Sequence, residues 1–116
     1  SDDVDLARPR LLSMRPDQPQ VQAVSQSAYA QNNGQQVRMR GAVVLTRAAD
    51  GGRAALRMET EELVAVPDED RFWTDAPVTL HSGGAVLRAR GMDFDNIARR
   101  VELHSDVAGT IPRSPR

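Results

Sequence analysis

The sequence predicts an all-β fold built from antiparallel strands, and three observations lead to this prediction. Apolar residues recur at every second position, as in Val37, Met39, Val43 and Leu45, which is the spacing of half-buried strands. Turn-forming residues interrupt the chain at regular steps. No stretch keeps the helical spacing of apolar residues for more than about two turns. We therefore expect an antiparallel sandwich or roll built from repeated hairpins.

Turn residues set the limits of the expected strands. Asn32-Asn33-Gly34 predicts a tight hairpin because asparagine and glycine tolerate positive φ angles. The segments 50–52 and 82–84, each ending in Gly-Gly, follow the same logic, and 67–70 and 95–96 give weaker turns. The expected strands are 4–14, 20–31, 35–47, 54–66, 71–82, 85–94 and 99–111. Together they form one predicted domain, residues 1–111, which a flexible tail, residues 112–116, follows.

A weak internal repeat supports an architecture of hairpins. The run 37–43 aligns with the run 101–107, and both have a small residue, Gly41 or Ser105, at the third alternate position. Each unit of about 30 residues would form one two-stranded hairpin that stacks on the next. An open stack of this kind leaves an unpaired strand edge at each end.

Composition excludes several classes of function. The chain has no cysteine, which rules out disulfide scaffolds, thiol catalysis and cysteine-based zinc sites. Its 15 basic residues are balanced by 16 acidic ones, unlike the positive excess of nucleic-acid-binding proteins. No apolar run approaches the length of a membrane span, and the start, Ser1-Asp2-Asp3, suggests a cut into a longer chain.

The inventory for catalysis is thin, and we expect no enzymatic activity, no metal and no cofactor. His81 and His104 are the only histidines, and strand alternation turns both away from the neighbouring valines and leucines. We interpret them as solvated strand residues. The arginines at strand positions suit phosphate groups, but they alternate with apolar residues, so we interpret most of them as a solvated face with glutamate partners across the strands.

The apolar stripes admit two interpretations, an ordinary core and a groove that holds lipid chains. The chain has only two phenylalanines, one tryptophan and one tyrosine, so valine and alanine would have to fill the interior. Such side chains close poorly between two sheets about 10 Å apart, which favours a groove. We expect this groove to be open along one side. Its predicted lining is Val37, Met39, Val43, Leu45, Leu56, Met58, Phe72, Val78, Leu80, Leu87, Val101, Leu103 and Val107.

Four segments together resemble a known family. They are the stretches 40–43 (RGAV), 58–67 (METEELVAVP), 74–80 (TDAPVTL) and 89–95 (ARGMDFD), followed by 101–109 (VELHSDVAG). Each is short, but in this order and spacing they resemble LptC, the lipopolysaccharide-export protein of Gram-negative bacteria, over about residues 23–111.

The resemblance implies a fold, a location and a set of partners. The fold is a twisted, open antiparallel β-jellyroll like that of LptA. The location is the periplasmic side of the inner membrane. We expect the family's single N-terminal transmembrane helix and its first strand region to precede this chain. The function is to receive lipopolysaccharide from the ATP-driven LptB/LptF/LptG transporter on the N-terminal side and pass it to the LptA bridge. An LptA-like soluble bridge and a purely structural β-module that assembles edge to edge remain as alternatives.

The last expected strand is the candidate edge for LptA. The residues assigned to this edge are Arg99, Val101, Leu103, Ser105, Val107 and Gly109.

Overall fold

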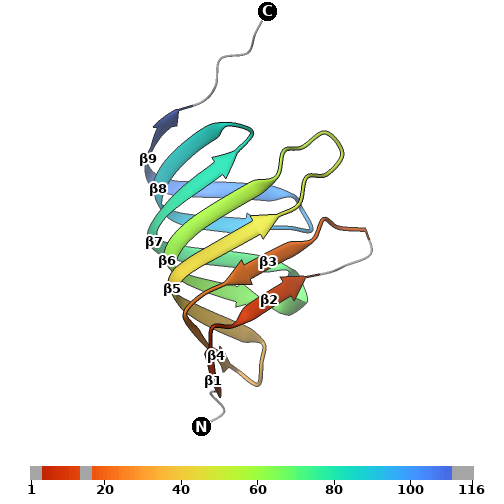
Figure 1. Cartoon of the computed structure of the whole chain (residues 1–116), viewed down its shortest axis with the longest axis vertical. Coiled ribbons are helices and arrows are strands. Elements are labelled where there is room, and N and C mark those ends of the chain that lie inside the picture. The colour runs from red at the N-terminus through yellow and green to blue at the C-terminus, as the bar shows by residue number, and fades with distance from the viewer. Residues whose placement is uncertain (1–3, 14–16, 111–116) are drawn as a thin grey trace, which may run out of the picture.

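The computed structural model describes residues 4–13 and 17–110, which form a single antiparallel sheet of nine strands (Figure 1). A short 3-10 helix, η1 (Pro67–Glu69), connects two of the long strands. The all-β prediction is confirmed, whereas the expected tail, 112–116, lies outside the described residues. The strands are β1 (Val4–Ala7), β2 (Arg10–Ser13), β3 (Val21–Val24), β4 (Ser27–Gln31), β5 (Gln36–Arg47), β6 (Leu56–Val66), β7 (Arg71–Ser82), β8 (Ala85–Asp95) and β9 (Arg100–Thr110).

Two of the seven expected strands are wrong, because each contains two strands. The segment 4–14 holds β1 and β2, and the segment 20–31 holds β3 and β4. The reason is that β5 is long enough to pair with two partners: its first part pairs with β4 and its last part with β3. β1 and β2 follow the same division, since they pair with β4 and β3 respectively.

The pairing register shifts near the middle of each pair of long strands, and the sheet bends along this row of register shifts. Figure 1 shows the strands turning back along one side of the molecule. A β-bulge adds residues to one strand of a pair and bends it, so a row of bulges folds the whole sheet. The register shifts lie between Arg40 and Val43 in β5, Thr60 and Val64 in β6, Thr74 and Pro77 in β7, and Arg88 and Arg90 in β8.

Gly91 illustrates why the bend needs particular residues. Its φ is +89°, and a Cβ atom there would lie 2.6 Å from Nδ1 of His104 on the neighbouring strand. A residue with a side chain would therefore meet both backbone strain and a steric clash. The glycine lets β8 and β9 stay paired through the bend.

The bend divides the sheet into two halves that enclose one apolar core. We call them the β4 half, which contains β1 and β4, and the β3 half, which contains β2 and β3. Met39 and Phe94 come from the β4 half, Leu45 and Met58 from the β3 half, and all are at most 1% exposed. Phe94 stacks on Phe72 with ring centroids 5.8 Å apart. The core thus lies between the two halves, as in a flattened roll.

Candidate functional site

The predicted groove lining occupies the space between the two halves of the sheet. All of the predicted residues except Val107 belong to the buried core or pack against it. Val37, Leu87, Val101 and Leu103 are the partly buried members of this set. Whether lipid occupies this space stays a prediction, but the side chains proposed for it do line one continuous interior.

The interior is closed at its centre and opens towards β9. Leu45 is 0% exposed, so the wall is closed at that residue. Leu103 is only partly buried, and Val107 is 52% exposed. Val107 and Gly109 lie on the same face of β9, because side chains alternate along a strand. This is the inner face, since Gly109 pairs with Leu87 of β8, which faces inwards. Val107 is exposed because β9 ends the sheet and no further strand covers it.

Sequence reasoning missed several interior residues near the bends. Leu63, Met92 and Phe94 are each at most 1% exposed and belong to the core. The register shift between Thr60 and Val64 puts both Thr60 and Leu63 inside, which a strict alternation cannot produce. The run of apolar residues from Leu63 to Val66 was the available signal.

The expected LptA-facing edge is a real edge of the sheet. β9 pairs only with β8 and stands last in the strand order. Arg99 is an exception among the residues assigned to this edge, because it lies in the turn before β9 with φ 55° and points to another part of the molecule. It forms an ion pair with Asp50 at 2.7 Å.

Opposite the bends, the turns of the β4 half meet the loops of the β3 half. We call this side of the roll the mouth. Asp70 and Asn96, both 0% exposed, lie in turns of the β4 half. Asn96 Nδ2 donates to Asp70 Oδ2 at 2.7 Å and to the carbonyl oxygen of Pro19 at 3.3 Å. Ser13 Oγ donates to Asp70 Oδ1 at 2.6 Å. These bonds link turns at 67–70 and 96–99 to the loop between β2 and β3.

Arg99 adds a second link across the mouth. Besides its ion pair with Asp50, its Nη2 donates to the carbonyl oxygen of Asp17 at 3.3 Å. Asp50 belongs to the hairpin between β5 and β6, in the β3 half. We call the contacts of Asp70, Asn96 and Arg99 with the opposite loops the clasp. The clasp closes the mouth through polar side chains, whereas continuous strands close the side with the bends.

The two histidines lie on the outer faces, as predicted. His81 Nε2 is 3.1 Å from Glu59 Oε1, and His104 Nε2 is 2.9 Å from Asp93 Oδ2. The hydrogen bond from His81, followed by one from Arg57, lowers the pKa of Glu59. Within the described part of the chain, no three histidine or acidic side chains gather as metal ligands would.

Only some of the outer arginines have a glutamate partner across the strands, as Arg38 and Arg40 do, whereas Arg57 pairs within β6 and Arg90 and Arg99 pair with aspartates. Arg38 pairs with Glu62, and Arg40 lies 3.6 Å from the same carboxylate. Arg57 pairs with Glu59 at 3.2 Å. These groups are largely solvated, and exposed pairs of this kind contribute little to stability. They are consistent with a solvated outer face.

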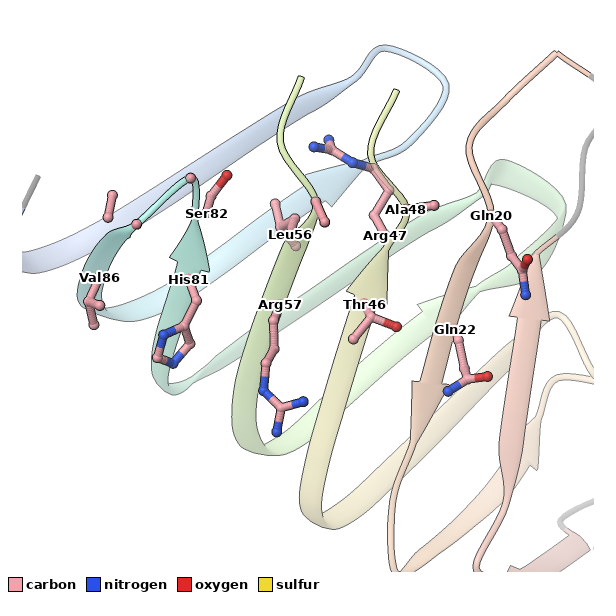
Figure 2. A pocket seen from close by; sticks show the side chains of 14 residues that line it. Gln20, Gln22, Thr46, Arg47, Ala48, Leu56, Arg57, His81, Ser82 and Val86 are labelled. Atoms are coloured by element: carbon pink, nitrogen blue, oxygen red, sulfur yellow. The ribbon is translucent and has the colours of Figure 1, made fainter. Parts of the chain in front are cut away.

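A cavity of about 510 Å³ lies at the free ends of the strands in the β3 half. Thr46, Arg57 and His81 are direct cross-strand neighbours in its wall. Figure 2 shows them projecting to the same side of the strands. Arg47 and Leu56 line the cavity as well. Of the residues predicted for the interior, only Leu56 reaches it.

Comparison of the sequence with models of protein families identifies the family of this chain. A family model described as "Lipopolysaccharide-assembly, LptC-related" matches residues 1–112. The chain belongs to the LptC family. This family is the periplasmic part of the inner-membrane lipopolysaccharide export system, and its members are transport components rather than enzymes. The chain therefore has a role in lipopolysaccharide transport.

A solved structure shows the same fold. The crystal structure of LptH, the LptA-homologous periplasmic component of the lipopolysaccharide transport device from Pseudomonas aeruginosa, matches with a TM-score of 0.70. The match covers 96% of this chain and 95% of LptH at 10% sequence identity, so it shows the LptA-like β-jellyroll fold alone. A search of curated proteins gave no match.

One structural finding bears on the membrane. Over the residues that the structure describes, no helix has the length and apolar character to cross a bilayer.

Proposed function

We propose that this chain carries lipopolysaccharide by holding its acyl chains between the two halves of the sheet. The observation that carries the proposal is the continuous apolar interior that becomes accessible at β9. Each CH₂ group moved out of water is stabilised by about 0.8 kcal/mol, so acyl chains favour such a space strongly. A site that stays partly open at one end can still release them.

We infer the direction of transfer from the resemblance to LptC, and the two ends of the sheet offer one edge for each partner. β1 and β9 stand at opposite ends of the strand order, and the unpaired groups of an end strand can pair with a strand of another protein. The chain would receive lipopolysaccharide from the LptB/LptF/LptG transporter near β1. It would pass the lipid to LptA at β9, where Leu103 packs against the core and Val107 is exposed at the edge.

Loading requires one wall of the interior to move, because core side chains such as Met39 and Met58 are 0% exposed and packed against one another. The side with the bends is held by strands that run through it. The mouth is held by the side-chain contacts of the clasp. We propose that the mouth is the side that opens.

Site-specific photo-crosslinking tests the carrier function. A photoreactive residue replaces Leu103, on the inner face, or Glu102, the adjacent outward residue, in delipidated protein. With added lipopolysaccharide we expect crosslinks from position 103 and few from position 102. Crosslinks of equal yield at both positions, or at position 102 only, contradict an interior binding site.

A soluble bridge is the second candidate, and the likeness to LptH favours it, since that protein is described as homologous to LptA. Capture assays distinguish the two. An LptC-like carrier binds detergent-solubilised LptB/LptF/LptG, whereas a bridge binds LptC and further copies of itself. Concentration-dependent assembly without any lipopolysaccharide binding would instead indicate a purely structural β-module.

A further inference from the structure

The cavity at the ends of the β3 half has an unusual chemical composition. Its wall contains two arginines, Arg47 and Arg57, together with His81 and the polar side chains of Gln22 and Thr46. None of the described residues that line it is acidic, although the chain has 16 acidic residues. Such a wall offers hydrogen-bond donors to an anion, although Glu59, which is not part of the wall, already contacts Arg57 and His81.

Arg47 is the least usual member of this wall. It is 7% exposed, and its Nη2 donates to the carbonyl oxygen of Ala54 at 3.0 Å. Its Nε is buried and has no hydrogen-bond partner among the described residues. Burial and then the charge of Arg53 lower the pKa of Arg47, whereas Asp50 has the opposite effect. A buried donor without an acceptor is costly, and an anion would remove that cost.

Arg57 and His81 supply the outer part of the wall. Both contact the carboxylate of Glu59, at 3.2 and 3.1 Å, so this pair is already partly neutralised. The Arg57 side chain is 52% exposed and has further N–H donors free to turn towards the cavity. A planar guanidinium matches the oxygens of a phosphate with two parallel hydrogen bonds.

The cavity adjoins the lipid-holding interior. Arg47 and Leu56 are direct cross-strand partners of β5 and β6, and Leu56 belongs to the buried core. Arg47 has the same alternation as the buried Leu45, whereas Thr46 points to the other side of the strand (Figure 2). A ligand with chains in the interior could therefore place its headgroup in the cavity without leaving the protein.

We propose that this cavity binds a phosphate group of the lipopolysaccharide headgroup while the acyl chains of the same molecule lie in the interior. This rests on the proposed carrier function. The shared chemistry is that of a phosphate monoester, which free phosphate also offers, so the test separates the two sources.

The experiment compares lipopolysaccharide with the same lipid treated with phosphatase. The full chain is titrated with each fluorescent lipid, as wild type and as Arg47→Gln and Arg57→Gln. Arg88→Gln is the matched control, since Arg88 is exposed on the outer face of β8 and does not line the cavity. We expect each cavity variant to bind the phosphorylated lipid about tenfold more weakly. Neither variant should change the affinity for the dephosphorylated lipid.

Equal affinity of wild type for the two lipids overturns the proposal, and so does a loss in Arg88→Gln as large as in the cavity variants. Arg57→Gln keeps the test valid if Arg47→Gln does not fold, because Arg57 is exposed. Amide NMR shifts of Gln22 and Thr46 on addition of inorganic phosphate test the cavity without lipid. If these shifts occur but no form of lipopolysaccharide binds, the carrier function fails and the cavity is a site for free phosphate.

Discussion

Replacing Asn96 by alanine tests whether the clasp holds the mouth closed. Asn96 is 0% exposed and donates to the Asp70 carboxylate at 2.7 Å and to the Pro19 carbonyl at 3.3 Å. A hydrogen bond to a charged group contributes about 1.5–3 kcal/mol. The substitution also removes Oδ1 of Asn96, a buried acceptor without a partner, and this gain offsets part of the lost stability. We expect the free energy of unfolding to fall by about 2 kcal/mol, which lowers Tm by about 10 °C.

Thermal unfolding at neutral pH measures this effect, and Ile97→Ala is the control. Ile97 lies in the same turn but is 48% exposed, so its truncation should shift Tm by no more than about 2 °C. If the clasp gates the interior, Asn96→Ala should also take up fluorescent lipopolysaccharide faster than wild type. A Tm shift no larger than that of Ile97→Ala would show that the buried bonds contribute nothing. Lower Tm with unchanged uptake would refute the mouth as the route of entry.

Three other predictions follow from burial, bends and edges. Leu45→Glu places a charge at a position with 0% exposure and should prevent folding, whereas Leu103→Glu should fold and bind lipopolysaccharide more weakly, as measured by circular dichroism and lipid titration. Gly91→Ala should lower stability by about 1 kcal/mol more than Gly34→Ala, measured by urea unfolding, since the two share a φ near +88° but only Gly91 would clash. Val107→Pro should leave the fold intact, because Val107 has no register partner in β8, but weaken capture of LptA; undiminished capture would contradict the β9 edge.

The long strands were predictable from sequence because their limits are local. Gly-containing turns at 32–34, 50–52 and 82–84 fix the hairpins, and alternation between them identifies the inner face. The breaks in 4–14 and 20–31 were not predictable in this way. They depend on β5 pairing with two strands, which is a long-range property that neither segment encodes.

Some residues of the candidate site were likewise predictable from local sequence, whereas others depend on long-range contacts. The inner positions of the straight strand segments follow from alternation, but alternation fails at the register shift between Thr60 and Val64, where Leu63 lies inside. Arg47 shares the phase of Leu45, so the pattern already placed it inside, yet its charge kept it off any apolar stripe. The clasp joins Ser13 to Asp70 and Pro19 to Asn96, and no local motif marks contacts between residues so far apart in sequence.

The two sides of the roll are therefore held together differently: continuous strands join the halves at the bends, and the side-chain contacts of the clasp join them at the mouth. At the bends, backbone hydrogen bonds and core packing hold the halves together, and a lipid cannot substitute for either. At the mouth, Asp50 pairs with Arg99, and both charges act on Arg47 beside the cavity. A phosphate in this cavity and the Asp50 carboxylate would both stabilise the positive charge of Arg47, since both are anions. Removing the charge of Asp50 should therefore favour the phosphate, so that Asp50→Asn should bind phosphorylated lipopolysaccharide more tightly than wild type. Equal or weaker binding by Asp50→Asn would show that Asp50 does not influence the cavity through Arg47.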